Sequence, residues 1–228
     1  MRIPLCVLAA SALFPVLCAS AEESVMIHHS FGGSPDAALS DSPVDSSKDS
    51  SGWADTHESL RADGMFGVGK GQTRNAYIPF SPEPGHIYTC TLKLEISNPL
   101  DDGSKDSTDW AAIGLSDKPG KGLLPLSSAC SLLLRRDGRG QVNLRGESGN
   151  PNRDGNHSAK VIHGATTATL GLILNTSGND WQVTYQVDGE DVGERVFLTK
   201  PEIQFLGIGQ TGTAEGRFIE LKLTRTEP

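Results

Sequence analysis

Apolar and polar residues alternate along much of the chain, which is the pattern of β-strands that bury one face. The segment His86–Ser97, HIYTCTLKLEIS, has Tyr, Cys, Leu, Leu and Ile at every second position, with Thr, Lys and Glu between them. Successive side chains of a strand point to opposite faces, so this segment predicts an antiparallel strand with one buried face. The segment Trp181–Gly193, WQVTYQVDGEDVG, alternates in the same way and contains the tight-turn dipeptide Asp188-Gly189, so it predicts a hairpin.

Further strands are predicted where the chain shows the same alternation or a short apolar run bounded by turn residues. No window of useful length shows the 3.6-residue period of an amphipathic helix. Roughly ten or more strands with turn signals between them predict an all-β sandwich of two antiparallel sheets. The additional predicted strands are Val25–Phe31, Asn75–Phe80, Asp109–Ser116, a hairpin over Cys130–Gly146, Ala168–Leu174, Ile203–Gly212 and Arg217–Arg225.

The first 21 residues have the composition of a secretory signal peptide. Arg2 precedes the apolar run Ile3–Cys18, and small residues follow at Ala19–Ala21. The sequence therefore predicts cleavage near Glu22, export to a secreted or periplasmic location, and a single mature domain over residues 22–228. The apolar run is too short for a comfortable membrane span, and no later segment is apolar enough to cross a membrane.

A lipoprotein acylated at Cys18 is the alternative to a cleaved signal peptide. It is the less favoured interpretation, because Leu17 stands where a small residue is expected. After the first strand, residues 32–52 are rich in Ser, Asp, Gly and Pro, a composition that buries little apolar surface. This segment predicts a long polar surface loop.

Cleavage of the signal peptide would leave two cysteines, Cys90 and Cys130, in the mature protein. A cysteine pair in an exported protein favours a disulfide, which would stabilise the fold by roughly 3–4 kcal/mol. Both residues lie on apolar faces of predicted strands, so two buried free thiols are the alternative.

The formal net charge of −8 comes without a cluster of basic residues. Binding to a nucleic-acid backbone needs clustered Lys and Arg, so nucleic acid is excluded as an expected partner. An anionic membrane surface is excluded for the same reason.

Four segments together resemble the concanavalin A-like lectin/glucanase superfamily, including its laminin-G-like members. They are the strand DWAAIGLS, a long apolar strand, the hairpin WQVTYQVDGEDVG and the closing stretch IQFLGIGQTGTAEGRFIELKLT. The resemblance covers roughly residues 25–226, and the chain is also similar to short exported bacterial proteins that carry this domain alone. It implies a jelly-roll sandwich of two curved antiparallel sheets, in which the concave sheet binds sugars.

The retaining glucanases of this family carry a Glu-x-Asp-x-Glu pattern on one strand face. Their two catalytic carboxylates must lie about 5–5.5 Å apart, which residues two or four apart on a strand can achieve. The pattern is absent here, since Glu95 and Glu220 each lack a carboxylate two residues before or after them. The sequence therefore disfavours this type of catalysis, and it leaves open an acid and a base assembled from separate strands.

Family members often bind Ca²⁺, and one acidic segment is a candidate for such a site. The segment DDGSKDSTD supplies Asp101, Asp102, Asp106 and Asp109. Hard cations need several oxygens that converge, and a solvated acidic loop is the favoured interpretation of this segment. The six histidines show no metal-ligand spacing.

Aromatic side chains are the expected platform for sugar rings. Trp181 alternates in phase with valines and is predicted to lie in the core, as is Trp110 at the start of an apolar strand. Trp53, with Arg74 and Tyr77 nearby in sequence, is the candidate carbohydrate-binding group.

The preferred function is thus an exported, non-catalytic module that binds an extracellular glycan or cell-envelope material, with Ca²⁺ as the one candidate cofactor. A glycan hydrolase or lyase with a non-standard carboxylate pair, and a purely structural or adhesive domain, are the alternatives.

Overall fold

The structure is a computed structural model, and it describes residues 23–47, 52–67, 73–100, 109–120, 128–143, 156–161, 167–197 and 199–228. Within these ranges the chain forms β-strands and one short 3₁₀ helix, which confirms the all-β prediction. The elements are β1 Glu23–His29, η1 Leu39–Asp41, β2 Ser46–Ser47, β3 Asp55–Thr56, β4 Met65–Phe66, β5 Arg74–Pro79, β6 Ile87–Ile96, β7 Trp110–Ser116, β8 Ser128–Arg135, β9 Arg139–Asn143, β10 Asn156–Val161, β11 Thr167–Asn175, β12 Gln182–Val187, β13 Glu190–Val196, β14 Phe205–Thr211 and β15 Gly216–Thr226.

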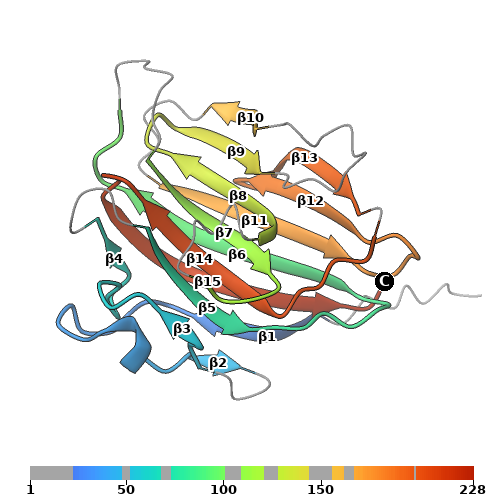
Figure 1. The fold of residues 1–228 in the computed structure, drawn as a ribbon, viewed down its shortest axis with the longest axis horizontal. Coiled ribbons are helices and arrows are strands. Elements are labelled where there is room, and N and C mark those ends of the chain that lie inside the picture. The colour runs from blue at the N-terminus through green and yellow to red at the C-terminus, as the bar shows by residue number, and fades with distance from the viewer. Residues whose placement is uncertain are drawn as a thin grey trace, which may run out of the picture.

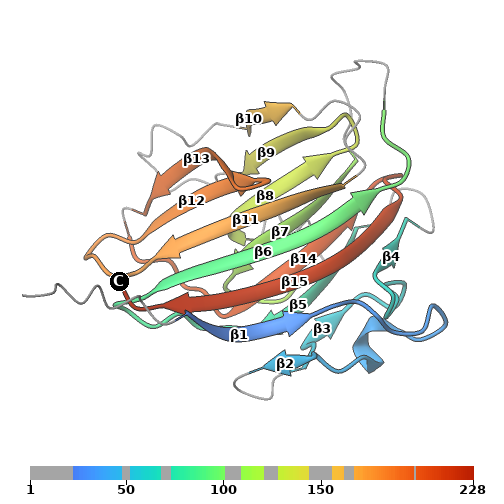
Figure 2. The same ribbon diagram turned by 180° about the vertical axis from the view of Figure 1, so that it is seen from behind.

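The strands form two sheets that pack face to face. The eight-stranded sheet has the order β13-β12-β11-β6-β15-β1-β2, with β4 paired to β15 beside this path. The seven-stranded sheet has the order β10-β9-β8-β7-β14-β5-β3. Figures 1 and 2 show the sandwich from its two sides, with β12, β11, β6, β15 and β1 side by side in Figure 2. The strand β14 and the strand β15 follow each other in sequence but lie in different sheets, so the chain crosses between the sheets at Gly212–Glu215.

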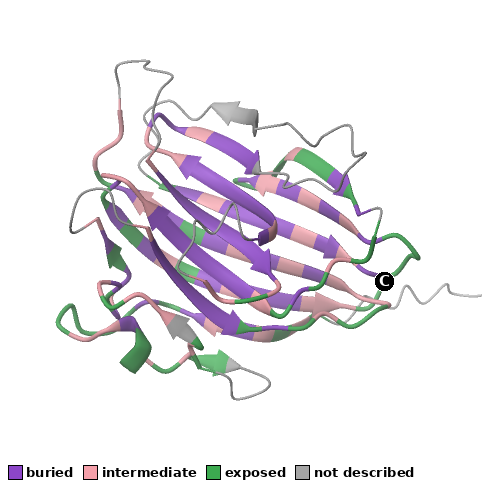
Figure 3. Cartoon of the chain, in the orientation of Figure 1, coloured by how far each residue is buried: buried purple, intermediate pink, exposed green. Residues whose placement is uncertain are grey.

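The core lies between the sheets, and strand alternation decides which side chains enter it. On β6 the apolar residues from Tyr88 to Ile96 are buried at every second position, as the sequence predicts. Leu92 is the register partner of Leu170 on β11 and of Leu221 on β15, and all three are buried. Figure 3 shows this alternation as buried segments along the strands.

The hairpin between β12 and β13 turns at Asp188 and Gly189, as the sequence predicts. Both residues have positive φ, 53° and 78°, which is the conformation of a type I′ turn. The carboxylate of Asp188 accepts a hydrogen bond from the backbone N–H of Thr169 at 2.8 Å, which attaches the turn to β11.

The polar segment over residues 32–52 differs in part from the predicted surface loop. Leu39, on η1, is fully buried, and its backbone N–H donates to the carbonyl of Leu60 at 2.8 Å. Figure 1 shows η1, β2, β3 and β4 together at one edge of the sandwich. These short strands and β10 were not predicted, because two-residue pairings and polar strands leave no alternation to detect.

The predicted signal peptide, residues 1–21, lies outside the described residues and stays a prediction. In the part of the chain that the structure describes, no helix has the length and apolar character needed to cross a membrane.

Candidate functional site

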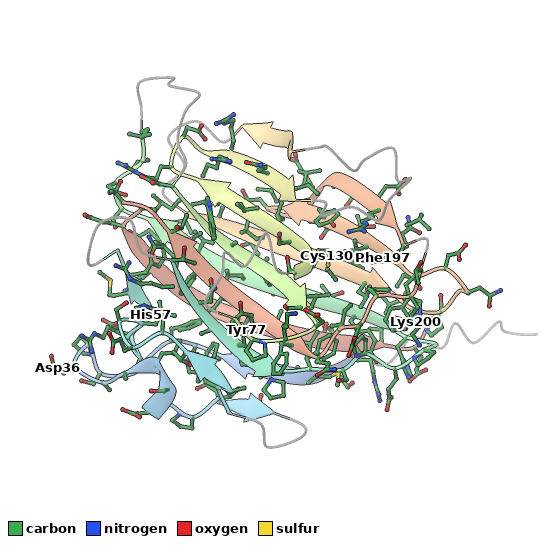
Figure 4. The ribbon with its side chains drawn as sticks, viewed as in Figure 1. Asp36, His57, Tyr77, Cys130, Phe197 and Lys200 are labelled. Carbon is green, nitrogen blue, oxygen red and sulfur yellow. The ribbon has the colours of Figure 1, made fainter. Side chains whose placement is uncertain are left out.

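A second apolar cluster lies on the outer face of the seven-stranded sheet, away from the core. It consists of Tyr77, Trp110, Ala112 and Leu133, with Phe205 packed against it. The rings of Tyr77 and Phe205 meet edge to face, with their centroids 6.3 Å apart. We call these five residues the outer cluster, and Figure 4 labels Tyr77 on β5.

Small residues occupy the sheet positions between the members of the outer cluster. Gly207 on β14 is the register partner of both Tyr77 and Gly114. Gly209, one pleat further along β14, pairs with Ala112. Neighbouring strands lie about 4.8 Å apart, so two adjacent glycine positions leave about 10 Å of sheet without side chains. This surface allows another group to approach the backbone closely.

That surface is covered in the structure, since Tyr77 is only 1% exposed. Part of the cover is the segment after β7. The Tyr77 hydroxyl and the Asn75 side-chain amide both donate to the carbonyl oxygen of Gly120, at 3.3 and 3.2 Å. Two donors from β5 thus converge on a single acceptor oxygen above the sheet.

Basic and amide side chains border the outer cluster on its β9 side. Arg135, the register partner of Trp110, donates to the amide oxygen of Gln141. Arg139 donates to the carboxylate of Asp137 at 2.7 Å. The border therefore offers hydrogen-bond donors beside an aromatic surface, and its one described carboxylate already has a cationic partner.

None of β5, β7, β8, β9 and β14 contains Asp or Glu at any position. The central part of the seven-stranded sheet therefore presents no pair of carboxylates that could act as nucleophile and acid. This observation agrees with the absence of a Glu-x-Asp-x-Glu pattern in the sequence.

Asp109 precedes β7 and lies in a network that joins three loops at one end of the sandwich. Its carboxylate accepts hydrogen bonds from Thr213 and from Arg136, the latter at 3.2 Å. Arg136 also donates to the carbonyl of Asn98 at 3.0 Å. Burial alone would raise the pKa of Asp109, but the hydrogen bonds from Thr213 and Arg136 and the positive charge of Arg136 outweigh burial, so the pKa lies below its usual value.

Solved structures of low sequence identity share this arrangement of sheets. The endo-1,3-beta-glucanase from Streptomyces sioyaensis matches with a TM-score of 0.56 and 12% identity, over 96% of this chain and 100% of that chain. The carbohydrate recognition domain of Emp47p matches with a TM-score of 0.50 and 12% identity, over 82% of this chain and 92% of that chain.

The chain has a concanavalin A-like jelly-roll fold. The exoplasmic/lumenal domain of VIP36 in its Ca²⁺-bound form is a further similar structure, with a TM-score of 0.48, 12% identity and coverage of 84% of this chain and 89% of that chain. No family model and no curated protein matches the sequence. At such low identity the likeness shows the fold, and the chemistry must be read from the residues.

In this jelly roll the three predicted carbohydrate-binding residues do not form one site. Tyr77 faces outward. Arg74 lies in phase with the inward-facing Ala76 and is fully buried, and its guanidinium donates to the side-chain oxygen of Gln210 at 2.7 Å. Trp53 packs beside the core against His29, with ring centroids 5.4 Å apart.

The two other tryptophans are buried, but on different sides of the seven-stranded sheet. Trp181 is in the core, as predicted, and Lys200 lies 4.4 Å over its ring. Trp110 belongs to the outer cluster instead of the core. The alternation along β7 indicates the outward position of Trp110, because Ala111 and Ile113 take the inward positions.

The candidate Ca²⁺ ligands Asp101, Asp102 and Asp106 lie outside the described residues. The fourth, Asp109, is paired with Arg136 and accepts a hydrogen bond from Thr213. Among the described residues, no group of three or more His, Cys, Asp or Glu side chains could hold a metal ion.

The structure has Cys90 and Cys130 as free, fully buried thiols instead of the favoured disulfide. Cys90 lies on β6 and Cys130 on β8, so a bridge would have to span the two sheets. Disulfides between the two sheets occur in other β-sandwiches, so the stacking alone does not exclude a bridge, and Cys130 is near enough to act on the pKa of Cys90. Burial raises the pKa of both thiols, that of Cys130 to about 12, so both are protonated at neutral pH.

We expect neither thiol to react with a water-soluble thiol reagent while the protein is folded, because reaction needs an accessible thiolate. After unfolding without reductant, both Cys90 and Cys130 should be labelled. Mass mapping of the labelled peptides measures this directly. A pair that stays unlabelled until reductant is added would establish the disulfide.

Proposed function

We propose that the protein is an exported, non-catalytic carbohydrate-binding domain that binds a neutral extracellular glycan on the outer face of its seven-stranded sheet. The observation that carries this proposal is the outer cluster itself. Three aromatic side chains, Tyr77, Trp110 and Phe205, surround a glycine-rich part of the sheet, with amide and guanidinium donors beside them. Aromatic rings stack on the apolar faces of sugars, and amides bond to their hydroxyls.

The hydrogen bonds to Gly120 support a binding role for β5. A carbonyl oxygen accepts from both Asn75 and Tyr77, and a sugar hydroxyl oxygen can accept from the same two donors. Binding at this position therefore requires the 117–120 segment to release these donors. The exchange replaces one set of hydrogen bonds with another, so most of the net affinity comes from aromatic contact.

The non-catalytic part of the proposal rests on the five central strands without a carboxylate. Hydrolysis with retention or inversion uses two carboxyl groups beside the scissile bond. A neutral glycan is the expected class of ligand, because the outer cluster consists of aromatic and aliphatic side chains and carries no charged group. The export part rests on the predicted signal peptide, residues 1–21.

The test is binding of the purified protein to a panel of neutral polysaccharides that includes β-1,3-glucan, with reducing ends measured in parallel. We expect binding without release of reducing ends. Phe205→Ala should weaken binding about 5- to 10-fold, because the side chain is half-buried in the outer cluster and supplies about 1 kcal/mol or more of stacking.

The matched control is Ile173→Ala on β11, a half-buried apolar side chain that faces outward from the opposite sheet. It should leave glycan affinity unchanged. Equal losses in the two variants would contradict binding on the seven-stranded sheet, and steady release of reducing ends would contradict the non-catalytic role.

A further inference from the structure

Two buried serines on β8 have hydroxyls without a hydrogen-bond partner. Ser128 is 4% exposed and Ser131 is fully buried, and neither Oγ atom is hydrogen-bonded to the residues that the structure describes. Ser131 lies two residues before Leu133 of the outer cluster, so it is on the same face of the sheet. An unpaired buried hydroxyl is unfavourable, and the great majority of buried polar groups are paired. Alanine would avoid this cost at both positions, so the stability of the fold does not explain why serine stands there.

A β-bulge brings the two serines to one face of β8. The register between β7 and β8 shifts between Leu115 and Ser116, so Ala129 is an extra residue on β8. Beyond the bulge, Ser128 pairs with Ser116. Residues three apart on a regular strand point to opposite faces, but the extra residue places both Ser128 and Ser131 on the outer face of the seven-stranded sheet.

The two serines border the same glycine. A Cβ atom on Gly114 would lie 3.1 Å from the Cβ of Ser131 and 3.3 Å from the Cβ of Ser128. Both serine side chains therefore flank the place where Gly114 has no side chain. The unpaired hydroxyls belong to one small region of the face and not to two separate ones.

This region is one end of a row that ends at an aromatic ring. Ser131, Gly114, Gly207 and Tyr77 are successive register partners on β8, β7, β14 and β5. At about 4.8 Å per strand, the Cα atoms of the serine and the tyrosine are about 14 Å apart, with two bare glycine positions between them. A sugar has an apolar ring face and a rim of hydroxyls, so the row offers a complementary group at each end.

The segment 117–120 crosses this row in the structure. The carbonyl of Lys118 accepts a hydrogen bond from the Ser116 hydroxyl on β7 at 2.8 Å, and the carbonyl of Gly120 accepts from Tyr77 on β5. Since β14 lies between β7 and β5, the segment passes above β14. It satisfies donors at both of its ends but leaves the hydroxyls of Ser128 and Ser131 unpaired.

We propose that Ser128 and Ser131 recognise the hydroxyls of the bound glycan and select a sugar unit with two free hydroxyls on one edge of its ring. This role rests on the proposed function, since it belongs to the same face. A serine hydroxyl can donate one hydrogen bond and accept another, as a sugar hydroxyl can. Binding only exchanges partners at Asn75 and Tyr77, whereas at the two serines it adds hydrogen bonds that the free protein lacks. These serine bonds therefore set the selectivity of the site.

The first measurement needs no ligand. Ser131→Ala removes an unpaired buried hydroxyl and should raise the midpoint of thermal unfolding by about 2–4 °C. The matched control is Ser116→Ala, which removes an equally buried hydroxyl that does donate a hydrogen bond, and it should lower the midpoint by a similar amount. A midpoint for Ser131→Ala below that of the wild type would show that the hydroxyl is paired in the free protein, and would overturn the proposal.

The second measurement is binding to the same panel of neutral polysaccharides, β-1,3-glucan included. Ser128→Ala and Ser131→Ala should each weaken binding about 5-fold or more. Thr91→Ala, which removes a half-buried outward hydroxyl from β6 of the opposite sheet, should bind as the wild type does. Wild-type affinity in both serine variants, together with weaker binding by Phe205→Ala, would overturn the role of the serines and leave the proposed function standing. Absence of binding by the wild type to every glycan would overturn the proposed function and the role of the serines with it.

Discussion

Replacement of Gly212 with alanine is expected to lower the free energy of unfolding by about 3 kcal/mol. Gly212 lies in the crossing between β14 and β15 and has a φ of 75°, a left-handed conformation that costs an alanine about 1 kcal/mol. A Cβ atom at this position would overlap with Oδ1 of Asp109. The carboxylate would have to move.

Movement of Asp109 has consequences, because its carboxylate is held from two directions. Thr213 and Arg136 both donate to its other oxygen. A hydrogen bond to a charged group contributes about 1.5–3 kcal/mol to the stability of the folded protein. Displacement of the carboxylate would also release Arg136 from the loop that contains Asn98. The expected loss therefore exceeds the backbone strain alone.

Urea unfolding measures the loss, and Gly189→Ala is the matched control. Gly189 has a similar φ of 78°, and a Cβ there would meet no atom within 4 Å, so only the strain of about 1 kcal/mol is expected. In an Asp109→Ala background, the loss of unfolding free energy caused by Gly212→Ala should likewise fall to about the loss caused by Gly189→Ala. Equal losses for Gly212→Ala in both backgrounds would show that the contact with Asp109 contributes nothing.

The long strands of the jelly roll could be predicted because each carries its own alternation. The strand around Leu92 and the hairpin at Asp188-Gly189 can be predicted without knowing which strands lie beside them, since the pleat and the turn are local. The inward position of Arg74 could also have been predicted from the alternation along β5, because Arg74 is two residues from the inward-facing Ala76. Its burial was not predicted, because charge is normally a sign of exposure.

The candidate site could not be predicted in the same way. The outer cluster joins residues that are distant in sequence, such as Tyr77 and Trp110, and only the strand order β8-β7-β14-β5 brings them to one face. Whether Cys90 and Cys130 are bridged likewise depends on how the sheets are stacked, which strand patterns do not specify. The unpaired serine hydroxyls on β8 show no sequence signal at all, because a serine on a strand does not indicate whether its hydroxyl has a partner.

The fold alone does not separate binding from catalysis, since its structural neighbours include both a glucanase and a carbohydrate recognition domain. The proposed distinction rests on the residues of the strands. A retaining glucanase needs carboxylates on a sheet face, and the five central strands of this sheet contain none. Glycines and aromatic residues stand there instead, and the proposed binding role rests on them.

Asp109→Asn is expected to lower the free energy of unfolding by about 2 kcal/mol at pH 7, because it weakens the charge-assisted bonds to Arg136 and Thr213. The effect should depend on pH. The pKa of Asp109 in the folded protein lies below its unfolded value, so its contribution is fully present above the unfolded pKa and is lost as the pH falls through the folded pKa.

The stabilities of the wild type and Asp109→Asn should therefore differ by a constant amount from pH 5 to 7, to within about 0.5 kcal/mol, and the difference should begin to shrink below about pH 4. Urea unfolding at pH 7, 5, 4 and 3 measures this convergence. Asp36→Asn, in the exposed loop before η1, is the control and should stay within about 0.5 kcal/mol of the wild type at pH 7. A difference for Asp109→Asn at pH 3 that is as large as at pH 7 would mean that the carboxylate charge does not hold these loops together, and the loss would then belong to side-chain packing.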